Sequence, residues 1–175
     1  MPHPAALPEE ELKKQVDSER TRSSGPGGQH RNKVETTVRL THRPTGIQAQ
    51  AGERRSQAEN LREALRRLRM NLALHYRTPL TDAMFVVPAS HRPSALWLSR
   101  VRDGRIAVNP DHHDFPAILA EALDVLHLYA DDHEHAAAAL GVTNSQFVKF
   151  LALEPSVLSA YNQRRAARGQ HPLRG

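Results

Sequence analysis

The 175 residues suffice for one or two small domains, and the lack of cysteine excludes disulfides and thiol nucleophiles. The formal net charge is +5, but it is unevenly spread: +6 over residues 1–77, −4 over residues 78–153 and +3 over residues 154–175. A basic first part is typical of a module that faces phosphates, whereas the acidic middle argues against a chain coated uniformly in RNA.

The first distinctive segment is glycine-rich, with three of the nine glycines at positions 25, 27 and 28. Glycine accepts positive φ and lets the backbone approach another surface closely. Gln29 follows, and cations flank the segment at Arg20, Arg22, Arg31 and Lys33. Neither G-x-G-x-x-G nor a closing Gly-Lys-Ser/Thr is present. We interpret the segment as a cationic loop that presents backbone N–H groups to a polyanion, with an ordinary glycine turn as the alternative.

Two strands and a long helix are predicted next. Residues 34–41 alternate apolar and β-branched side chains, residues 43–46 form a Pro-Gly turn, and residues 47–51 form a weaker return strand. The sequence Ser56-Gln57-Ala58-Glu59 matches a capping box. It begins a helix predicted over 56–76, with an apolar stripe and a basic opposite face at Arg62, Arg66, Arg67 and Arg69.

The second half is predicted to be mainly helical. Residues 79–113 indicate a linker or irregular arm with a hairpin at Asp103-Gly104, and residues 94–101 suit either a helix or a strand. Trp97 is expected to anchor a core, with base stacking as the alternative. Helices are predicted over 115–129, 134–140 and 144–151, with a last one beginning at Pro155.

The spacing of the middle helices is that of a helix-turn-helix unit, for which DNA reading and a small packing bundle are alternatives. Arg164, Arg165 and Arg168 in the last helix are better candidates for RNA backbone contacts. Histidine and aspartate cluster at 111–114 and 131–135, but neither cluster has a known ligand spacing, so no metal site and no cofactor are predicted.

From about Asp17 to Tyr76 the chain resembles the catalytic domain of class I peptide chain release factors and their stand-alone ribosome-rescue relatives. The resemblance is carried, in order and without a gap, by these residues: Arg22, Ser24, Gly25, Gly27-Gly28-Gln29-His30, Asn32-Lys33, Thr41-His42, Pro44-Thr45-Gly46-Ile47 and Arg55-Ser56-Gln57. Pro26 and Arg31 depart from the commoner alanine and valine. Proline fixes φ and removes one N–H donor, which makes the loop stiffer.

The residue patterns indicate the arm at 79–113 and the helix-turn-helix-like module at 114–175, so the predicted fold class is α+β. For residues 1–78 the resemblance implies a small GGQ-type domain. It also implies that Gly27, Gly28 and Gln29 reach the ester of peptidyl-tRNA in the ribosome's peptidyl-transferase centre. Ester hydrolysis builds negative charge on the carbonyl oxygen, which a backbone N–H at Gln29 can stabilise. His30 is the only adjacent titratable side chain, and a structural or RNA-contacting role for it is favoured over that of a general base.

The RNA contacts implied by the resemblance and by charge involve the following residues: Arg20, Arg22, Ser24, His30, Arg31, Asn32, Lys33, Arg54, Arg55, Gln57, Arg164, Arg165 and Arg168. Only about sixteen residues precede the domain, too few for a decoding domain, so we expect codon-independent release on stalled ribosomes. The chain carries no long basic tail like that of stand-alone rescue factors, which leaves the mode of sensing open.

The expected partners are large-subunit rRNA and P-site peptidyl-tRNA, with an additional rescue factor if one is required. A monomer is expected, without membrane contact. Met1–Pro8 lacks the basic and apolar regions of a signal peptide, and no apolar run reaches transmembrane length, so a cytoplasmic protein is expected. The alternatives are a non-catalytic ribosome or RNA adaptor and a DNA-binding regulator.

Overall fold

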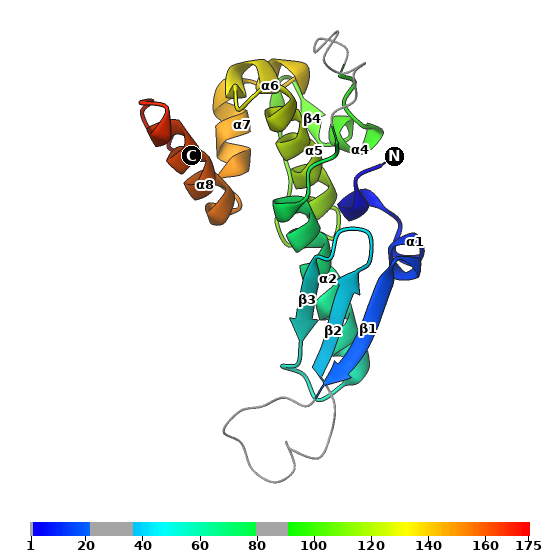
Figure 1. Cartoon of the computed structure of the whole chain (residues 1–175). Coiled ribbons are helices and arrows are strands. Elements are labelled where there is room, and N and C mark those ends of the chain that lie inside the picture. Colours follow the sequence, from blue (N-terminus) through cyan, green and yellow to red (C-terminus); the bar gives the residue numbers. More distant parts are fainter. Residues whose placement is uncertain (1, 22–36, 80–90) are drawn as a thin grey trace. The chain divides into compact units, whose positions relative to one another are not determined.

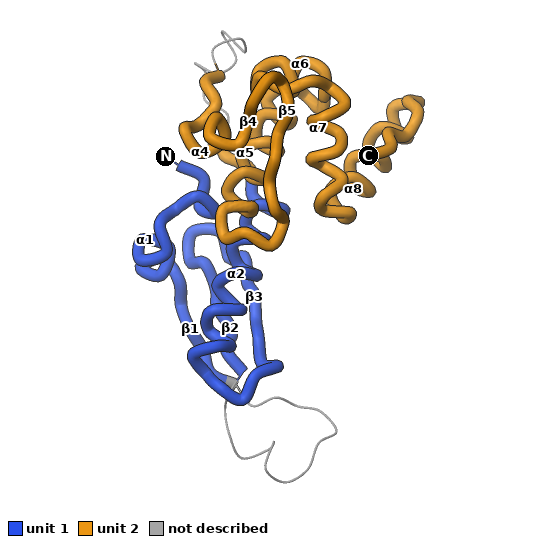
Figure 2. Tube along the Cα trace, turned by 180° about the vertical axis from the view of Figure 1, so that it is seen from behind, with its two compact units in different colours: residues 1–76 blue, residues 77–175 orange. Residues whose placement is uncertain are grey.

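The computed structural model describes residues 2–21, 37–79 and 91–175 (Figure 1). The chain divides into two compact units, residues 1–76 and 77–175 (Figure 2). The first combines a sheet with a long helix and the second is mainly helical, which confirms the predicted α+β class. Among the described residues, no helix has both the length and the apolar character needed to cross a bilayer.

Unit 1 is an antiparallel sheet packed on one helix. In chain order its elements are η1 (Pro4–Ala6), α1 (Glu9–Lys14), β1 (Val16–Thr21), β2 (Thr37–His42), β3 (Gln48–Ala51) and α2 (Gln57–His75). The strand order is β1-β2-β3, with β2 in the centre. The register runs from Val16 opposite His42 to Thr21 opposite Thr37. The strand ends that bound residues 22–36 are therefore held side by side.

The core of unit 1 lies between the sheet and α2. Leu65, Leu68 and Leu72 recur at helical spacing and pack on the side of the sheet that buries Val38 and Leu40. The N-terminus of α2 is capped as predicted, since the Ser56 Oγ accepts the Glu59 N–H at 3.4 Å. The predicted strands and long helix are thus confirmed as β2, β3 and α2.

Unit 2 is built around α5. Its elements are α4 (Ala95–Leu98), β4 (Val101–Arg102), β5 (Arg105–Ile106), α5 (Phe115–Leu128), α6 (His133–Ala139), α7 (Asn144–Leu151) and α8 (Pro155–Ala167). The helices predicted here are confirmed, and the segment left open between helix and strand contains the short helix α4. The Asp103-Gly104 turn joins β4 to β5, and both residues have positive φ, 49° and 71°.

Trp97 anchors the core of unit 2, as predicted. Its side chain is fully buried, its Nε1–H donates to the Leu140 carbonyl at 2.8 Å, and its ring meets Phe150 edge to face at 5.5 Å. Because Trp97 comes from α4, this contact fixes the segment before β4 onto the α6–α7 corner. The three-part division at 78 and 113 stays a prediction.

Candidate functional site

The glycine loop is the centre of the predicted site, and most of it lies outside the described residues. This applies to Gly27, Gly28 and Gln29 and to the following predicted RNA-binding residues: Arg22, Ser24, His30, Arg31, Asn32 and Lys33. The structure describes the frame to which this segment is attached. Thr21 and Thr37, which flank the segment, are paired across β1 and β2.

Arg20 and Gln57, two of the predicted RNA-binding residues, lie at this end of the frame. With the Gln57 amide oxygen turned toward Arg20, the guanidinium Nε and Nη2 donate to it at 2.5 and 3.3 Å. Arg20 is the second-last residue of β1 and Gln57 is the first of α2. Their contact therefore joins the edge strand to the start of the helix beside the loop.

Asn60 shapes the loop between β3 and α2, a role that sequence reasoning missed. Its side chain is fully buried; Oδ1 accepts the Arg54 N–H at 3.0 Å, and Nδ2 donates to the Arg54 carbonyl at 2.9 Å. A signal was present, because Asn60 lies four residues before Ala64 and eight before Leu68, on the apolar stripe of α2. A polar residue on that stripe indicates a buried hydrogen-bonding task.

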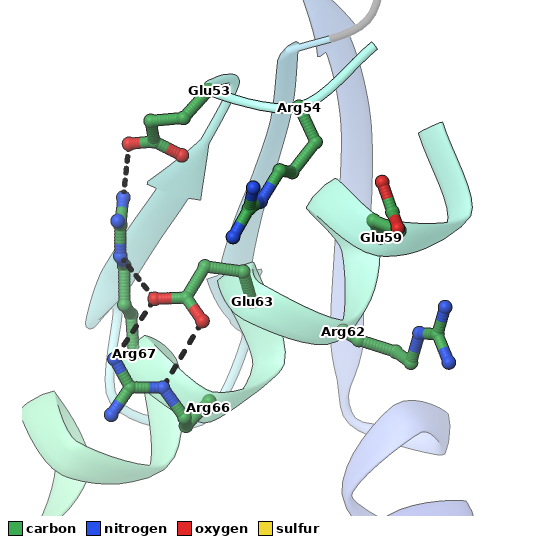
Figure 3. Close-up of a pocket in the computed structure, with 7 residues that line it drawn as sticks. All are labelled: Glu53, Arg54, Glu59, Arg62, Glu63, Arg66 and Arg67. Atoms are coloured by element: carbon green, nitrogen blue, oxygen red, sulfur yellow. Dashed lines mark hydrogen bonds and ion pairs between the residues drawn. The ribbon is translucent and has the colours of Figure 1, made fainter. Parts of the chain in front are cut away.

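These two hydrogen bonds hold the backbone of Arg54 on an exposed loop, and Arg55, the second predicted RNA-binding residue of this loop, follows it. Arg54 also borders a hollow with Glu53 and a set of residues on the outer face of α2: Glu59, Arg62, Glu63, Arg66 and Arg67 (Figure 3). We call these seven residues the arginine hollow. Its position extends the cationic surface from the base of the loop along the first half of the helix.

Two glutamates in the arginine hollow are already paired. Glu63 accepts from Arg66 at 2.9 and 3.1 Å and from Arg67 Nε at 3.0 Å, and Glu53 accepts from Arg67 Nη1 at 2.8 Å (Figure 3). The hydrogen bond from Arg66 lowers the pKa of Glu63, and the one from Arg67 lowers the pKa of Glu53. Both carboxyls are therefore ionised at neutral pH and hold the two guanidinium groups in place.

Arg69 departs from the predicted basic face. It is half-buried and donates to the carbonyls of Ala5 and Leu7 at 3.3 and 2.8 Å. These bonds tie the N-terminal turn of the chain to α2. Arg69 is thus a structural residue, and the exposed basic face of the helix is shorter than the sequence suggested.

The Thr41-His42 and Pro44–Ile47 part of the family motif builds the turn between β2 and β3. His42 is fully buried, and its Nε2–H donates to Gln15 Oε1 at 3.0 Å while Nδ1 accepts from the Thr45 hydroxyl at 2.8 Å. Burial, with a smaller effect from Arg43, lowers the pKa of His42. Gly46 closes the turn at a φ of 70°, which glycine adopts without strain.

In unit 2, the predicted RNA-binding arginines of α8 make contacts within the protein. Arg164 forms a bidentate pair with Asp131 at 2.9 and 3.1 Å, and Arg168 donates to the same carboxylate at 2.9 Å. Arg165 donates to the His171 carbonyl at 2.9 Å. Burial acts to raise the pKa of Asp131, but the two arginines outweigh it and the pKa is lowered. These contacts fasten α8 to the corner between α5 and α6.

The helix-turn-helix spacing corresponds to α6, a turn at residues 140–143 and α7. The Thr143 hydroxyl caps α7, and the Thr143 N–H donates to the Gly104 carbonyl of the β4–β5 hairpin at 2.9 Å. On α7, the helix that would read bases in a helix-turn-helix unit, Asn144, Ser145 and Lys149 are exposed and Gln146 is half-buried. Only one of these four side chains is cationic.

The two histidine–aspartate clusters lie at helix starts. Asp132 caps α6 through the Glu134 and His135 N–H groups, and His133 is buried. His112, His113 and Asp114 place their ligand atoms within 4.8 Å of one another, and Asp114 is engaged by Arg100 at 3.0 Å. Of the two clusters, the one at residues 112–114 is the closer to a ligand set, although both of its histidines are exposed.

Comparisons with known proteins find the same relationship for unit 1. Residues 7–83 match the model of the RF-1 domain family. Peptide chain release factor 1 of Symbiobacterium thermophilum is 48% identical over 67 residues, which cover 38% of this chain and 18% of that protein. The chloroplastic peptide chain release factor PrfB1 of Arabidopsis thaliana is 50% identical over 66 residues, covering 38% of this chain and 14% of that protein.

A longer alignment reaches into unit 2. Peptide chain release factor 1 of Rhodospirillum rubrum is 34% identical over 134 residues, covering 69% of this chain and 37% of that protein. Since 69% of the chain is about 120 residues, the alignment must continue past residue 83. The chain contains an RF-1 domain and is partially homologous to release factors, and it spans well under half the length of these relatives.

Proposed function

We propose that the protein hydrolyses the ester of peptidyl-tRNA on the ribosome, without reading a stop codon, and so releases peptides from stalled ribosomes. The RF-1 domain match over residues 7–83 is the observation that carries the proposal. The matched segment includes the glycine loop, whose Gly27, Gly28 and Gln29 are the proposed catalytic residues. The proposed partners are large-subunit rRNA and the peptidyl-tRNA in the P site.

The physical chemistry of the loop supports ester hydrolysis by positioning. A backbone N–H at Gln29 would stabilise the oxyanion, and loss of one such donor typically slows a reaction by about 10²–10³-fold. The Gln29 side chain would shape a pocket that admits water and excludes larger nucleophiles. The paired ends of β1 and β2 give the loop a rigid base, which favours a fixed approach to the ester.

Codon reading by the Pro44-Thr45 pair is disfavoured by the place of this pair in the β2–β3 turn. Its threonine hydroxyl bonds His42 and accepts the Ile47 N–H at 3.3 Å, so this pair is used in folding the β2–β3 turn. The α6–α7 and α8 surfaces of unit 2 are then the remaining candidates for sensing a stalled state, with or without an additional rescue factor.

The test uses purified ribosomes that hold labelled peptidyl-tRNA on messages ending in a stop codon, a sense codon or no codon in the A site. We expect similar release from all three complexes and loss of release in Gln29→Ala, with ribosome binding kept. Release that requires the stop codon would contradict codon independence. Co-sedimentation with ribosomes but no release would contradict hydrolysis and favour the adaptor.

A further inference from the structure

We propose that the arginine hollow is a docking surface for an RNA phosphate backbone, separate from the glycine loop, with Asn60 as its positioning residue. The proposal rests on the proposed function, since it places the surface on ribosomal RNA. It concerns binding only and assigns no step of the reaction to these residues.

The glutamates of the arginine hollow hold some of its arginines in place, while other arginines have no carboxylate partner among the described residues. Glu63 and Glu53 fix Arg67 through Nε and Nη1, so its orientation is set before any ligand arrives. The side chains of Arg54 and Arg62 carry no hydrogen bond or ion pair to any residue within 2–21, 37–79 and 91–175. A pre-ordered guanidinium loses less entropy when it binds phosphate, and its planar donors suit two oxygens at once.

Asn60 determines where Arg54 stands. Its amide bonds both the N–H and the carbonyl of Arg54, which fixes the backbone of that residue in a loop that is otherwise exposed. Figure 3 shows the Arg54 side chain directed toward Glu63, at the centre of the hollow. The buried amide thus holds the backbone of one loop arginine beside a surface whose other arginines lie on α2.

A second hollow continues this surface. It shares Arg67 with the first and is otherwise lined by the polar or small residues Arg39, Gln48, Ala49, Gln50 and Asn71. Together the two hollows present five arginines and three glutamates, and two of those glutamates are held by Arg66 and Arg67. The uncompensated charge is positive.

The composition of the lining favours a nucleic acid backbone over a protein partner. Neither hollow is lined by an aromatic or a large aliphatic side chain, whereas the centre of a protein–protein interface is usually apolar and rich in aromatic residues. A phosphate backbone needs only cations and hydrogen-bond donors, and its binding weakens steeply with salt.

The test compares ribosome binding of the wild type and the double variant Arg54→Gln/Arg62→Gln over a range of KCl concentrations, with fluorescently labelled full-length protein. Loss of two phosphate contacts should weaken binding at low salt and reduce the slope of log K against log[KCl] by roughly 1.4–1.8. The matched control is Arg43→Gln, an exposed arginine of the same unit at the β2–β3 turn, which is paired with Asp17 and should leave the slope unchanged.

Asn60→Asp tests the positioning role. The carboxylate can still accept the Arg54 N–H but cannot donate to its carbonyl, so the salt slope should fall while thermal unfolding shows a folded protein. The same change in the Arg54→Gln/Arg62→Gln background should have a smaller effect, because it acts through Arg54. If Asn60→Asp does not fold, the proposal is tested by Arg54→Gln/Arg62→Gln alone.

An unchanged affinity and slope in the arginine variant would show that the hollow is only a solvated face and would overturn the proposal. Wild-type protein that binds with the expected slope but releases no peptide would overturn hydrolysis and leave the docking surface supported. If Arg43→Gln reduces the slope of log K against log[KCl] as much as the double variant does, the effect is one of net charge. That result would also overturn the proposal of a defined docking surface.

Discussion

A methyl group at position 52 should distort the base of the glycine loop. Gly52 follows β3, and an alanine Cβ there would lie 2.3 Å from the Thr37 Oγ1, 3.1 Å from its Cβ and 3.2 Å from its Cγ2. Rotating the threonine side chain does not relieve the contact with its Cβ. Since Thr37 is 8% exposed and begins β2, the backbone must move.

The expected cost follows from overpacking a buried site, about 1–3 kcal/mol, less the roughly 0.4–1 kcal/mol that Gly→Ala gains by restricting the unfolded chain. The midpoints of these ranges, about 2 and 0.7 kcal/mol, leave a net loss of about 1.3 kcal/mol, which lowers the Tm of a domain the size of unit 1 by roughly 5–10 °C, at about 4–8 °C per kcal/mol. Thermal unfolding followed by circular dichroism at neutral pH measures this shift.

Thr37 provides the control. Its hydroxyl is buried and has no hydrogen-bond partner among the residues that the structure describes. Thr37→Ala removes both side-chain atoms beyond Cβ, so Gly52→Ala should cost much less in that background. Thr37→Val alone should stabilise unit 1 by about 1 kcal/mol, because an unpaired buried polar group is replaced by a methyl. A Gly52→Ala protein that unfolds within 1 °C of the wild type, with no coupling to Thr37→Ala, would refute this reasoning.

Three further predictions concern stability. Burial lowers the pKa values of His42 and His133 in the folded protein. The unfolded chain therefore binds protons more readily, so the stability that each neutral histidine contributes above its unfolded pKa of about 6.5 is lost as the pH falls. The free energy of unfolding by denaturant should then depend less on pH, between about pH 7.5 and 5, in a variant with both histidines changed to glutamine. Asp131→Asn should destabilise unit 2 by about 1 kcal/mol, because asparagine cannot form the ion pairs with Arg164 and Arg168. Asparagine tolerates the backbone φ of 65°, so the change tests the charge alone, and 1 M NaCl should reduce its effect. Trp97→Phe should cost about 1–3 kcal/mol, since the buried Leu140 carbonyl loses its donor; a Tm equal to that of the wild type would contradict this.

Local signals predicted the elements that carry them. The Ser56 cap, the Asp103-Gly104 turn and the apolar stripe of α2 each depend on residues within one or two turns, and each has the predicted structure. The edge strand β1 gave no such signal. Its residues from Asp17 to Arg20 are exposed, so no apolar alternation marks it, and it is held by pairing with β2.

The environment of the charged residues could not be predicted from the sequence. The sequence identifies Arg164 and Arg168 as candidates for RNA contacts, but their partner Asp131 lies 33 and 37 positions earlier in the chain. Arg69 falls on the same basic run as Arg66 and Arg67, yet it bonds carbonyls more than sixty residues away. Charge along a helix shows which residues are cations, and only the tertiary contacts show which of them remain available.

The described part of the family motif has mainly a folding role. His42, Thr45 and Gly46 close the β2–β3 turn, Ser56 caps α2, and Gln57 receives Arg20. A sequence match over these residues therefore indicates a shared scaffold, in which the chain segments on either side of residues 22–36 are held together. Under the proposed function, we expect the residues that touch substrate to come from residues 22–36, and those that touch RNA to come from surfaces whose arginines are not already paired within the protein. By that criterion Arg54 and Arg62 are stronger candidates than Arg164 or Arg168, because the latter two already neutralise Asp131.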